Sequence, residues 1–504
     1  MRDKIIFWQD GNFINFGIAK LLQEKYDCDM YAIINITDKP KRFFQEQQIV
    51  KYKKFWFYHD CIQKNNQKLD LEYLKQFELK YGLNLWLLSF NERFFYNFNE
   101  FYKFSPDEIL KILEQECKLF DSILEEVRPD FLIMATPNFH FDHLFYKMCD
   151  VRGIKIMILR QTRFGFRCMI SKEMDKIDFQ SEQSIPSGPI RTLEELLSYR
   201  KGFDLGKEMD EYKTGFMASK LDLIKAVIQL LISKNRNVKT HYTYYGRTKL
   251  RVLVKSVSYS LRTKIRESFI NRTFVKKIDE NNPFVYFPLH VDQEHTMLIG
   301  APFYTNQLEV IRHILKSLPI GYKLYVKEHP LMNSRSWREI SFYKQIMALP
   351  NVVLVHPSVS PEEIMKKCSL VIAILGTSSM EAAFYGKPSI SFVDLGLSLI
   401  SSVYKLNSIE DLPEAIRTSL TKKINLSELN KYVNLIDKNS FEFNYSRAFL
   451  DYSRFFYIGG YLVDIEITND KMQSYIEKNR NTFDFLADEH IKKIKQHKEF
   501  ESKT

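Results

Sequence analysis

The chain has 504 residues, of which 45% are hydrophobic, and it carries a formal net charge of +11. This length and hydrophobicity are sufficient for two folded domains and argue against an intrinsically disordered chain. The small numbers of glycine (17) and proline (16) argue against a fibrous repeat or a long flexible linker.

The apolar runs and the spacing of the cysteines indicate in which cellular compartment the protein lies. The apolar run near the first residue is too short for a signal peptide, and the longest apolar stretch, around residues 223–232, is too short to span a bilayer. The six cysteines include no CxxC pair, which is typical of reduced thiols in the cytosol. We therefore expect a cytoplasmic protein without a disulfide framework.

The first third of the chain alternates between apolar strands and amphipathic helices. This alternation predicts an α/β domain with a parallel sheet and right-handed crossovers, which we assign to residues 1–170. The strands are expected at residues 4–8, 30–34, 130–135 and 154–159, and the helices at residues 13–26, 106–126 and 142–152.

Residues 171–282 are less regular, and we interpret them as a mostly helical insertion that connects two domains. Thirteen Lys and Arg residues lie between Lys234 and Lys277, where Glu267 is the only acid. Such a basic segment, with tyrosines interleaved, can bind an anionic membrane surface, an acidic acceptor or nucleic acid. The solvated face of a helix is an equally good explanation.

A second α/β domain is expected over residues 283–410, followed by helices over residues 411–504. The Lys-rich tail from Lys492 to Thr504 is expected to fray. The strands of this domain are predicted at residues 284–287, 322–326, 352–355, 370–375 and 389–393, and its helices at residues 306–317, 361–367 and 378–385.

Several common fingerprints are missing from the sequence. The first strand is not followed by GxGxxG, and no GxxxxGK[ST] occurs, which argues against a dinucleotide dehydrogenase and a P-loop ATPase. No HExxH or comparable ligand spacing occurs, so we expect neither a metal nor another cofactor. No RNA- or DNA-binding motif is present, and we do not expect a nucleic-acid partner.

Two strand-end loops of the second domain carry polar residues. One holds Glu328-His329-Pro330, and the other holds Gly376-Thr377-Ser378-Ser379 directly before a helix. Because ligands bind beyond the carboxyl ends of parallel strands, the hydroxyls, free N–H groups and helix dipole favour an anion there, and His329 can donate to the same phosphate. Helix capping by Ser378 with Glu381, and a structural role for His329, are the alternatives.

The same loops belong to a longer resemblance. The sequence resembles the capsular polysaccharide biosynthesis family, which includes transferases that take Kdo from CMP-Kdo. The resemblance is clearest over residues 283–393. It rests on Tyr286-Phe287-Pro288-Leu289-His290, Gln293-Glu294, Gln307, Leu324 to Pro330, Gly376 to Ala382, and Gly386-Lys387-Pro388.

The resemblance implies a GT-B-like fold, in which two Rossmann-like domains face a cleft, with the donor on the C-terminal one. It implies that His329 contacts the donor phosphate together with Ser378 or Ser379. It also implies that Glu328 or Glu381 lies near the nucleotide. The predicted donor-binding residues are Gln307, Glu328, His329, Pro330, Gly376, Thr377, Ser378, Ser379 and Glu381.

The N-terminal domain is expected to bind the acceptor and to supply a general base for an inverting transfer. The candidates at its strand ends are Asp10, His140 and Asp142. Asp142 is preferred because the related motif places an acid there, although capping of the following helix explains it equally well. Arg160 and Arg163 can hold an anionic acceptor or a donor carboxylate, or can be surface charges.

The sequence therefore predicts a metal-independent glycosyltransferase that works in capsule or lipopolysaccharide assembly at the inner face of the membrane. Its donor would be a nucleotide-sugar, with CMP-Kdo suggested by the resemblance, and its acceptor a glycan or a lipid-linked glycan. The basic segment would then contact anionic lipid. The alternatives are a transferase that uses CDP-glycerol or CDP-ribitol, and a non-catalytic protein that binds membrane or nucleic acid.

Overall fold

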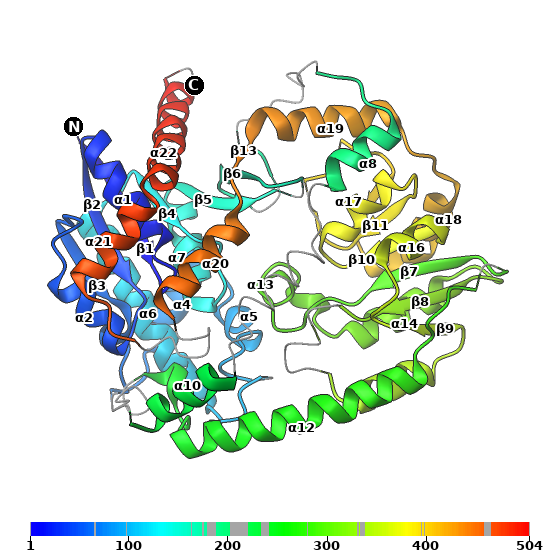
Figure 1. The fold of residues 1–504 in the computed structure, drawn as a ribbon, viewed down its shortest axis with the longest axis horizontal. Helices are drawn as coiled ribbons and strands as arrows, with labels where there is room; N and C mark the ends of the chain where they lie inside the picture. The colour runs from blue at the N-terminus through cyan, green and yellow to red at the C-terminus, as the bar shows by residue number, and fades with distance from the viewer. Residues whose placement is uncertain are drawn as a thin grey trace.

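The computed structural model describes residues 2–64, 67–96, 98–162, 164–173, 176–178, 188–201, 220–232, 241–279, 281–329, 332, 338–394, 396–397, 399–457 and 465–502. The chain forms two α/β halves, each built on its own largely parallel sheet (Figure 1). This confirms the predicted class, with two Rossmann-like domains as in the GT-B arrangement.

The N-terminal sheet has seven strands in the order β13-β6-β5-β4-β1-β2-β3. The four pairings that join β5, β4, β1, β2 and β3 are parallel, whereas β6 pairs antiparallel with both β5 and β13. The strands are β1 (Asp3–Gln9), β2 (Cys28–Ile34), β3 (Lys54–Phe57), β4 (Phe131–Met134), β5 (Lys155–Gln161), β6 (Arg167–Ser171) and β13 (Phe441–Glu442).

Helices cover both faces of this sheet because its central strands are apolar on both sides. On β1, Ile5 and Phe7 contribute to one core cluster, and Ile6 and Trp8 contribute to the other. The helices of the first 151 residues are α1 (Ile14–Lys25), α2 (Asp38–Glu46), α3 (Tyr58–Cys61), α4 (Leu71–Tyr81), α5 (Leu85–Phe90), α6 (Pro106–Val127) and α7 (His140–Val151).

The C-terminal sheet has six parallel strands in the order β12-β11-β10-β7-β8-β9. Its strands are β7 (Phe284–Pro288), β8 (Lys323–Lys327), β9 (Val352–Val355), β10 (Leu370–Ala373), β11 (Ser389–Ser391) and β12 (Val403–Lys405). The surrounding helices are α13 (His295–Leu298), η3 (Pro302–Tyr304), α14 (Gln307–Ser317), α15 (Ile340–Met347), α16 (Pro361–Lys367), α17 (Thr377–Phe384), η5 (Ile409–Asp411), α18 (Leu412–Thr421) and α19 (Leu426–Asn439).

The last helices return to the N-terminal sheet. Helices α20 (Tyr445–Phe456), α21 (Asn469–Lys478) and α22 (Arg480–Glu501) contribute to the same core cluster as α1. Gly17 allows the close approach of α22, because a Cβ at this position would lie 2.4 Å from the ring of Phe483.

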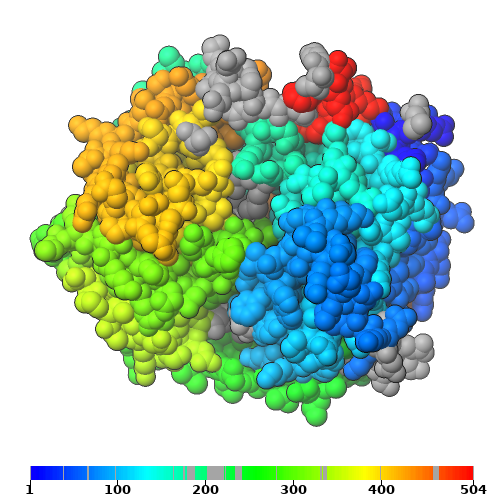
Figure 2. Space-filling model, turned by 180° about the vertical axis from the view of Figure 1, so that it is seen from behind, coloured from blue at the N-terminus to red at the C-terminus, as the bar shows by residue number. Residues whose placement is uncertain are grey.

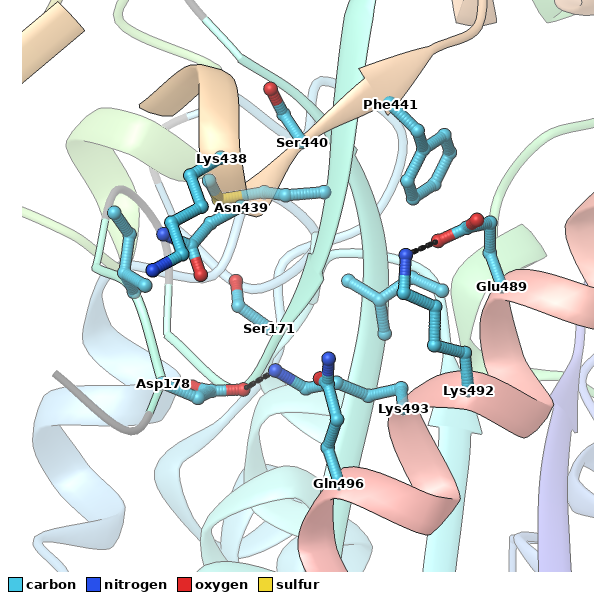
Figure 3. Close-up of a pocket in the computed structure, with 13 residues that line it drawn as sticks. Ser171, Asp178, Lys438, Asn439, Ser440, Phe441, Glu489, Lys492, Lys493 and Gln496 are labelled. Atoms are coloured by element: carbon cyan, nitrogen blue, oxygen red, sulfur yellow. Dashed lines mark ion pairs between the residues drawn. The ribbon is translucent and has the colours of Figure 1, made fainter. Parts of the chain in front are cut away.

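Helix α22 continues to Glu501, whereas the sequence favoured a frayed tail from residue 492. The reason is that Ile494 and His497 are buried and that Lys493 forms a largely buried ion pair with Asp178 at 2.9 Å. Figure 3 shows this ion pair in a polar pocket between α22 and strands β6 and β13.

The connecting region contains α8 (Leu193–Lys201), α10 (Lys220–Ile232), η2 (Tyr242–Tyr244) and the 25-residue helix α12 (Lys249–Thr273). Helix α12 runs along one side of both domains (Figure 1). Near its start Arg251 donates to the Phe101 carbonyl at 3.1 Å, and just after its end Val275 forms a parallel bridge with Val355 of β9.

The predicted helical basic segment between the domains is thus confirmed, although its first part, including Lys234, Arg236 and Lys239, lies outside the described residues. No helix in the described part of the chain combines the length and apolarity needed to cross a membrane.

Candidate functional site

His290 lies between the two predicted strand-end loops, which follow β8 and β10. Strand β7, which continues into Leu289 and His290, pairs with β10 on one side and with β8 on the other. The Nε2 atom of His290 accepts a hydrogen bond from the Leu375 N–H at 3.3 Å. The carboxyl edge therefore brings together the loops that carry His290, His329 and Gly376.

Gly376 makes the turn from β10 into α17 with a φ of 144°, a region that residues with a side chain rarely adopt. A Cβ on Gly376 would lie 3.4 Å from Nε2 of His290, which is an ordinary van der Waals contact. Glycine is thus needed for the backbone conformation of the turn, and the imidazole of His290 lies directly beside it.

The start of α17 is not capped by a side chain, since its N-cap residue is Gly376. Glu381 instead forms an ion pair with Arg200 of α8 at 2.8 Å, so the alternative of a Ser378–Glu381 capping box is not what the structure shows. Thr377 and Ser378 are partly exposed. Uncapped N–H groups and two hydroxyls at the positive end of a helix favour an anion.

Ser379 differs from its two neighbours. Its side chain is fully buried, and its hydroxyl donates to the Gly376 carbonyl at 3.2 Å. Its own carbonyl accepts the Ser389 hydroxyl at 2.6 Å. The structure therefore uses Ser379 to fix the turn, which leaves Thr377 and Ser378 as the hydroxyls that face outward.

The imidazole of His290 lies close to His329. Burial, followed by the neighbouring His329, lowers the pKa of His290 to about 3, so His290 is neutral at pH 7. A neutral His290 whose Nε2 is an acceptor carries its proton on Nδ1. His329 itself is partly exposed at the end of β8.

Glu328 points away from this anion site and into a buried network. Its carboxylate accepts hydrogen bonds from Arg338 at 2.5 Å and from the Tyr343 hydroxyl at 2.5 Å. Arg338 also pairs with Asp292 at 2.8 Å and donates to the His290 carbonyl. Glu328 thus positions the loop of His290, and nothing in the sequence pattern distinguished it from a ligand-facing residue.

Gln307 supports the same loop from the start of α14. Its side chain accepts from the His290 N–H at 2.8 Å and donates to the His290 carbonyl at 3.0 Å and to Asp292. Only 2% of Gln307 is exposed, and its hydrogen bonds hold the backbone of His290 in place from inside the domain. Pro330, the last residue of the predicted motif, lies outside the described residues.

The sequence did not predict two residues of this site, His290 and Arg338. His290 was part of the resemblance and follows a strand, which was a sufficient signal for a strand-end ligand. Arg338 gave no signal, because it lies ten positions beyond Glu328, outside every strand and helix that the sequence predicts. Its role depends entirely on the tertiary contacts with Glu328 and Asp292.

In the N-terminal domain, Asp142 caps helix α7. Its two carboxylate oxygens accept the N–H groups of Asn138 at 2.9 Å and Phe139 at 2.8 Å. Burial raises the pKa of Asp142 to about 7, although these two hydrogen bonds oppose the shift. The capping alternative is therefore the one that the structure shows.

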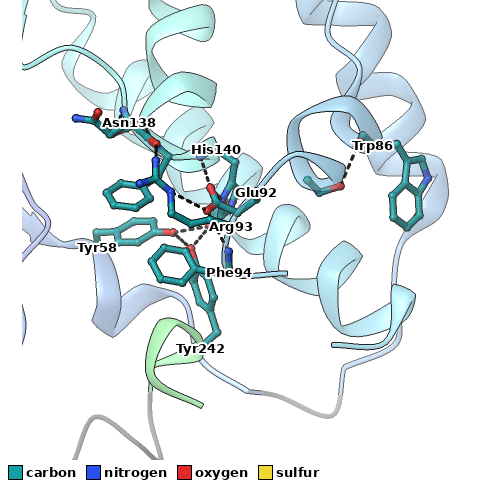
Figure 4. A network of polar contacts seen from close by, with 12 residues as sticks. Tyr58, Trp86, Glu92, Arg93, Phe94, Asn138, His140 and Tyr242 are labelled. Carbon is teal, nitrogen blue, oxygen red and sulfur yellow. Dashed lines mark hydrogen bonds and ion pairs between the residues drawn. The ribbon is translucent and has the colours of Figure 1, made fainter. Parts of the chain in front are cut away.

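His140 lies in a closed polar network of the same domain (Figure 4). It is 2% exposed, and its ring nitrogens contact Glu92 at 2.9 Å and Glu116 at 3.1 Å. Burial would lower the pKa of His140, but the two carboxylates outweigh it and raise the pKa to about 10. A permanently protonated imidazole held by two carboxylates cannot serve as a general base near neutral pH.

Asp10 follows β1 at the carboxyl edge of the N-terminal sheet. Its carboxylate accepts the Asn12 N–H at 2.9 Å and lines a small cavity with Met134, Ala135 and Tyr445. Burial raises its pKa above the ordinary value, although backbone hydrogen bonds oppose the shift. Of the three acid–base candidates, Asp10 alone is neither a helix cap nor locked in an ion pair.

The two predicted arginines have different outcomes. Arg160 is buried on β5, where it donates to the Ser171 hydroxyl at 2.8 Å and to the Lys176 carbonyl at 3.1 Å. These contacts tie β5 to β6 and the residues after it. Arg163 lies outside the described residues.

The two domains touch beside these edges. Asn91, next to Glu92, donates to the Pro302 carbonyl of η3 at 3.3 Å. An open cavity of about 420 Å³ lies where the β5–β6 turn meets α8 and residues 442–444. Figure 2 shows the two halves in contact along a seam across the molecule. Within the described ranges, no group of three or more metal-ligating side chains forms.

The comparison with known families matches residues 174–396 to the model described as capsule polysaccharide biosynthesis protein. The resemblance to this family is confirmed over that stretch. We refer to residues 174–396 as the family-matched region. No curated protein matches the chain.

The family-matched region contains the entire C-terminal half of the site. His290, His329, Arg338 and the Gly376 turn all lie inside it, as does helix α12. The N-terminal candidates Asp10, His140, Asp142 and Arg160 lie outside it.

Solved structures similar to the chain include two kinds of enzyme. One is UDP-GlcNAc 2-epimerase from Methanocaldococcus jannaschii, with 14% identity, coverage of 87% of this chain and 100% of that chain, and a TM-score of 0.24. The other is KpsC, beta Kdo 2,4 transferase, of Thermosulfurimonas dismutans, with 12% identity, coverage of 60% and 78%, and a TM-score of 0.29.

Proposed function

We propose that the chain is a glycosyltransferase of surface-polysaccharide synthesis that takes a sugar from a CMP-activated donor. Kdo or a related acidic sugar is the proposed group, and a glycan or lipid-linked glycan at the inner face of the membrane is the proposed acceptor. The observation that carries the proposal is the uncapped start of α17 beside His290, inside the family-matched region.

The donor phosphate would accept hydrogen bonds from the first N–H groups of α17 and from the Thr377 and Ser378 hydroxyls. His329 would donate to the phosphate oxygen that leaves with the nucleotide. When the acceptor hydroxyl attacks, a new C–O bond forms at the anomeric carbon and the sugar–phosphate bond breaks. The bond electrons leave with CMP, and a general base takes the hydroxyl proton.

Release of CMP in the presence of different donors tests this function. Purified protein would be incubated with CMP-Kdo, CDP-glycerol and UDP-sugars together with membrane extracts as acceptors. Nucleotide release from CMP-Kdo or a related CMP-sugar would support the proposal. Turnover of CDP-glycerol alone would replace it by polyol-phosphate transfer. Salt-sensitive binding to membranes without turnover of any donor would indicate a non-catalytic protein.

The structure favours Asp10 as the general base, ahead of the predicted Asp142. We expect Asp10→Asn to lower kcat by about 10²–10⁴-fold, the usual contribution of a general base, with little change in the KM for the donor. Because burial raises the pKa of Asp10, the acidic limb of the kcat/KM profile should lie above the range of an ordinary aspartate.

Asp142→Asn is the matched control for this base. It should lower the free energy of unfolding by about 1 kcal/mol through the weakened cap of α7, while kcat changes little. A large loss of kcat in Asp142→Asn with full activity in Asp10→Asn would reverse the assignment.

The Gly376 turn gives a separate test of the donor site. Gly376→Ala should weaken CMP binding, measured by titration calorimetry, by about tenfold, since a φ of 144° is strained for a residue with a Cβ and the turn must shift to relieve the strain. Gly321→Ala is the control, because Gly321 also has a positive φ but precedes β8, at the opposite end of that strand from His329. Equal CMP affinities in both variants would contradict a phosphate site at this turn.

A further inference from the structure

Helices α10 and α12 expose an unusual amount of apolar surface. Of the 26 large hydrophobic residues exposed in the described part of the chain, eleven lie in these two helices, which have only 13 and 25 residues. They are Leu221, Leu223, Ile224, Ile228, Leu231, Ile232, Leu250, Val254, Val257, Leu261 and Ile265. Exposed apolar residues scattered singly need no explanation, but this concentration does.

On α12 the exposed apolar residues form one continuous stripe. Leu250, Val254, Val257, Leu261 and Ile265 recur every three or four residues, and each is between 58% and 72% exposed. This spacing places them on one face of a helix. The stripe faces solvent, whereas the opposite face of α12, with Arg266 and Ile270, is buried against the protein.

Cations accompany the stripe. Arg251, Arg262, Lys264 and Arg272 are exposed on α12, and Glu267 is the only acid of the helix. Helix α10 ends beside the start of α12, where Lys249 donates to the Leu231 carbonyl at 2.6 Å. The two helices therefore present adjoining apolar surfaces along the edge where α12 crosses both domains (Figure 1).

We infer that this surface binds an anionic phospholipid bilayer, with α10 and α12 lying in the plane of the interface. An apolar face flanked by Lys and Arg is the composition of helices that insert shallowly among lipid headgroups. The cations select a negatively charged partner, and an apolar stripe without a groove fits acyl chains. Nucleic acid would leave the eleven apolar side chains exposed.

The same helix supports the candidate donor site from its inner face. Burial lowers the pKa of Arg266, and the nearby Tyr343 and Glu328 oppose this shift. Phe274, directly after α12, packs edge-on against Tyr343 at a centroid distance of 5.2 Å. Because a helix with side chains is ~10 Å thick, a bilayer on the outer face of α12 would lie close to the Glu328 network.

The test is flotation of the full-length protein with lipid vesicles, which requires no knowledge of the donor. The protein should float with vesicles of phosphatidylcholine and phosphatidylglycerol, and much less with phosphatidylcholine alone. Val257→Asp/Leu261→Asp should reduce the bound fraction by about tenfold, because two carboxylates enter the stripe and oppose the anionic surface. Leu250→Asp/Val254→Asp should have the same effect at the other end of the stripe.

The matched control is Leu79→Asp/Ile320→Asp, which adds two carboxylates at strongly exposed apolar positions away from α10 and α12. It should float like the unmodified protein. Part of the binding should persist at high salt, since the stripe is apolar, and complete loss would overturn the insertion. Absence of flotation would overturn the proposal. If the unmodified protein also proved to be a dimer and the stripe variants monomers, the stripe would be a protein interface instead.

Discussion

Replacing His329 with alanine is expected to lower turnover of the CMP-activated donor by about 10²–10³-fold, the usual effect of removing one donor that stabilises developing charge. The loss should appear mainly in kcat, because the negative charge on the leaving phosphate grows as the sugar–phosphate bond breaks. Nucleotide release measured over a range of donor concentrations separates kcat from KM.

His356 offers a matched control for this variant. It also precedes a proline directly after a neighbouring strand, β9, but its ring contacts the Ser358 hydroxyl at 2.6 Å and the Asn271 side chain at 3.0 Å. His356→Ala should therefore leave turnover unchanged. Equal losses in the two variants would indicate general damage to the sheet edge. Full activity in His329→Ala would remove His329 from the mechanism.

The prediction of the fold from sequence succeeded where the pattern is local. Apolar strands such as Phe284–Pro288 are buried on both faces, and helix α6 (Pro106–Val127) lies where the amphipathic pattern predicted a helix, at residues 106–126. Positions at strand ends were predictable for the same reason, since parallel strands bring their carboxyl ends to one edge. His329 and Gly376 follow directly from this rule.

Side-chain roles were less predictable because they depend on partners far away in the sequence. Glu381 has the spacing of a capping residue for Ser378, yet Arg200 from α8 takes its carboxylate. Asp142 was equally suited to capping and to catalysis, and the structure shows the cap. The resemblance implied that Glu328 or Glu381 lies near the nucleotide, and the carboxylate of Glu328 has protein partners in Arg338 and Tyr343.

The basic segment shows a third kind of limit. Its charges were evident from the sequence, but the exposed stripe from Leu250 to Ile265 was not, because apolar residues at helical spacing usually face a core. Only the packing of Arg266 and Ile270 shows which side of α12 is buried. The rotation of α12 about its own axis therefore decides whether its apolar residues stabilise the fold or are available to a partner.

The largest effect on stability is expected for Arg338→Met. Arg338 is 2% exposed in its side chain and neutralises Glu328, which is 1% exposed, as well as Asp292. Removing the cation leaves the buried carboxylate of Glu328 and the partly exposed carboxylate of Asp292 without a countercharge, which should lower the free energy of unfolding by about 3–5 kcal/mol. Urea denaturation, followed by circular dichroism, measures the loss.

A second substitution tests whether uncompensated charge is the cause. Adding Glu328→Gln to Arg338→Met removes the buried carboxylate that has lost its cation. The double variant should therefore be more stable than Arg338→Met alone. Arg447→Met is the surface control, because the Arg447–Asp451 pair has side chains that are 57% and 42% exposed. Its loss of stability should stay below about 1 kcal/mol.

The Arg338 variant also separates support of the site from chemistry within it. Arg338 donates to the His290 carbonyl, so its loss frees the loop that holds the imidazole against Gly376. CMP affinity should therefore fall in Arg338→Met at temperatures where the protein is still folded, whereas His329→Ala should mainly lower kcat. If Arg338→Met kept both its stability and its affinity for CMP, the buried ion pair would not be what positions His290.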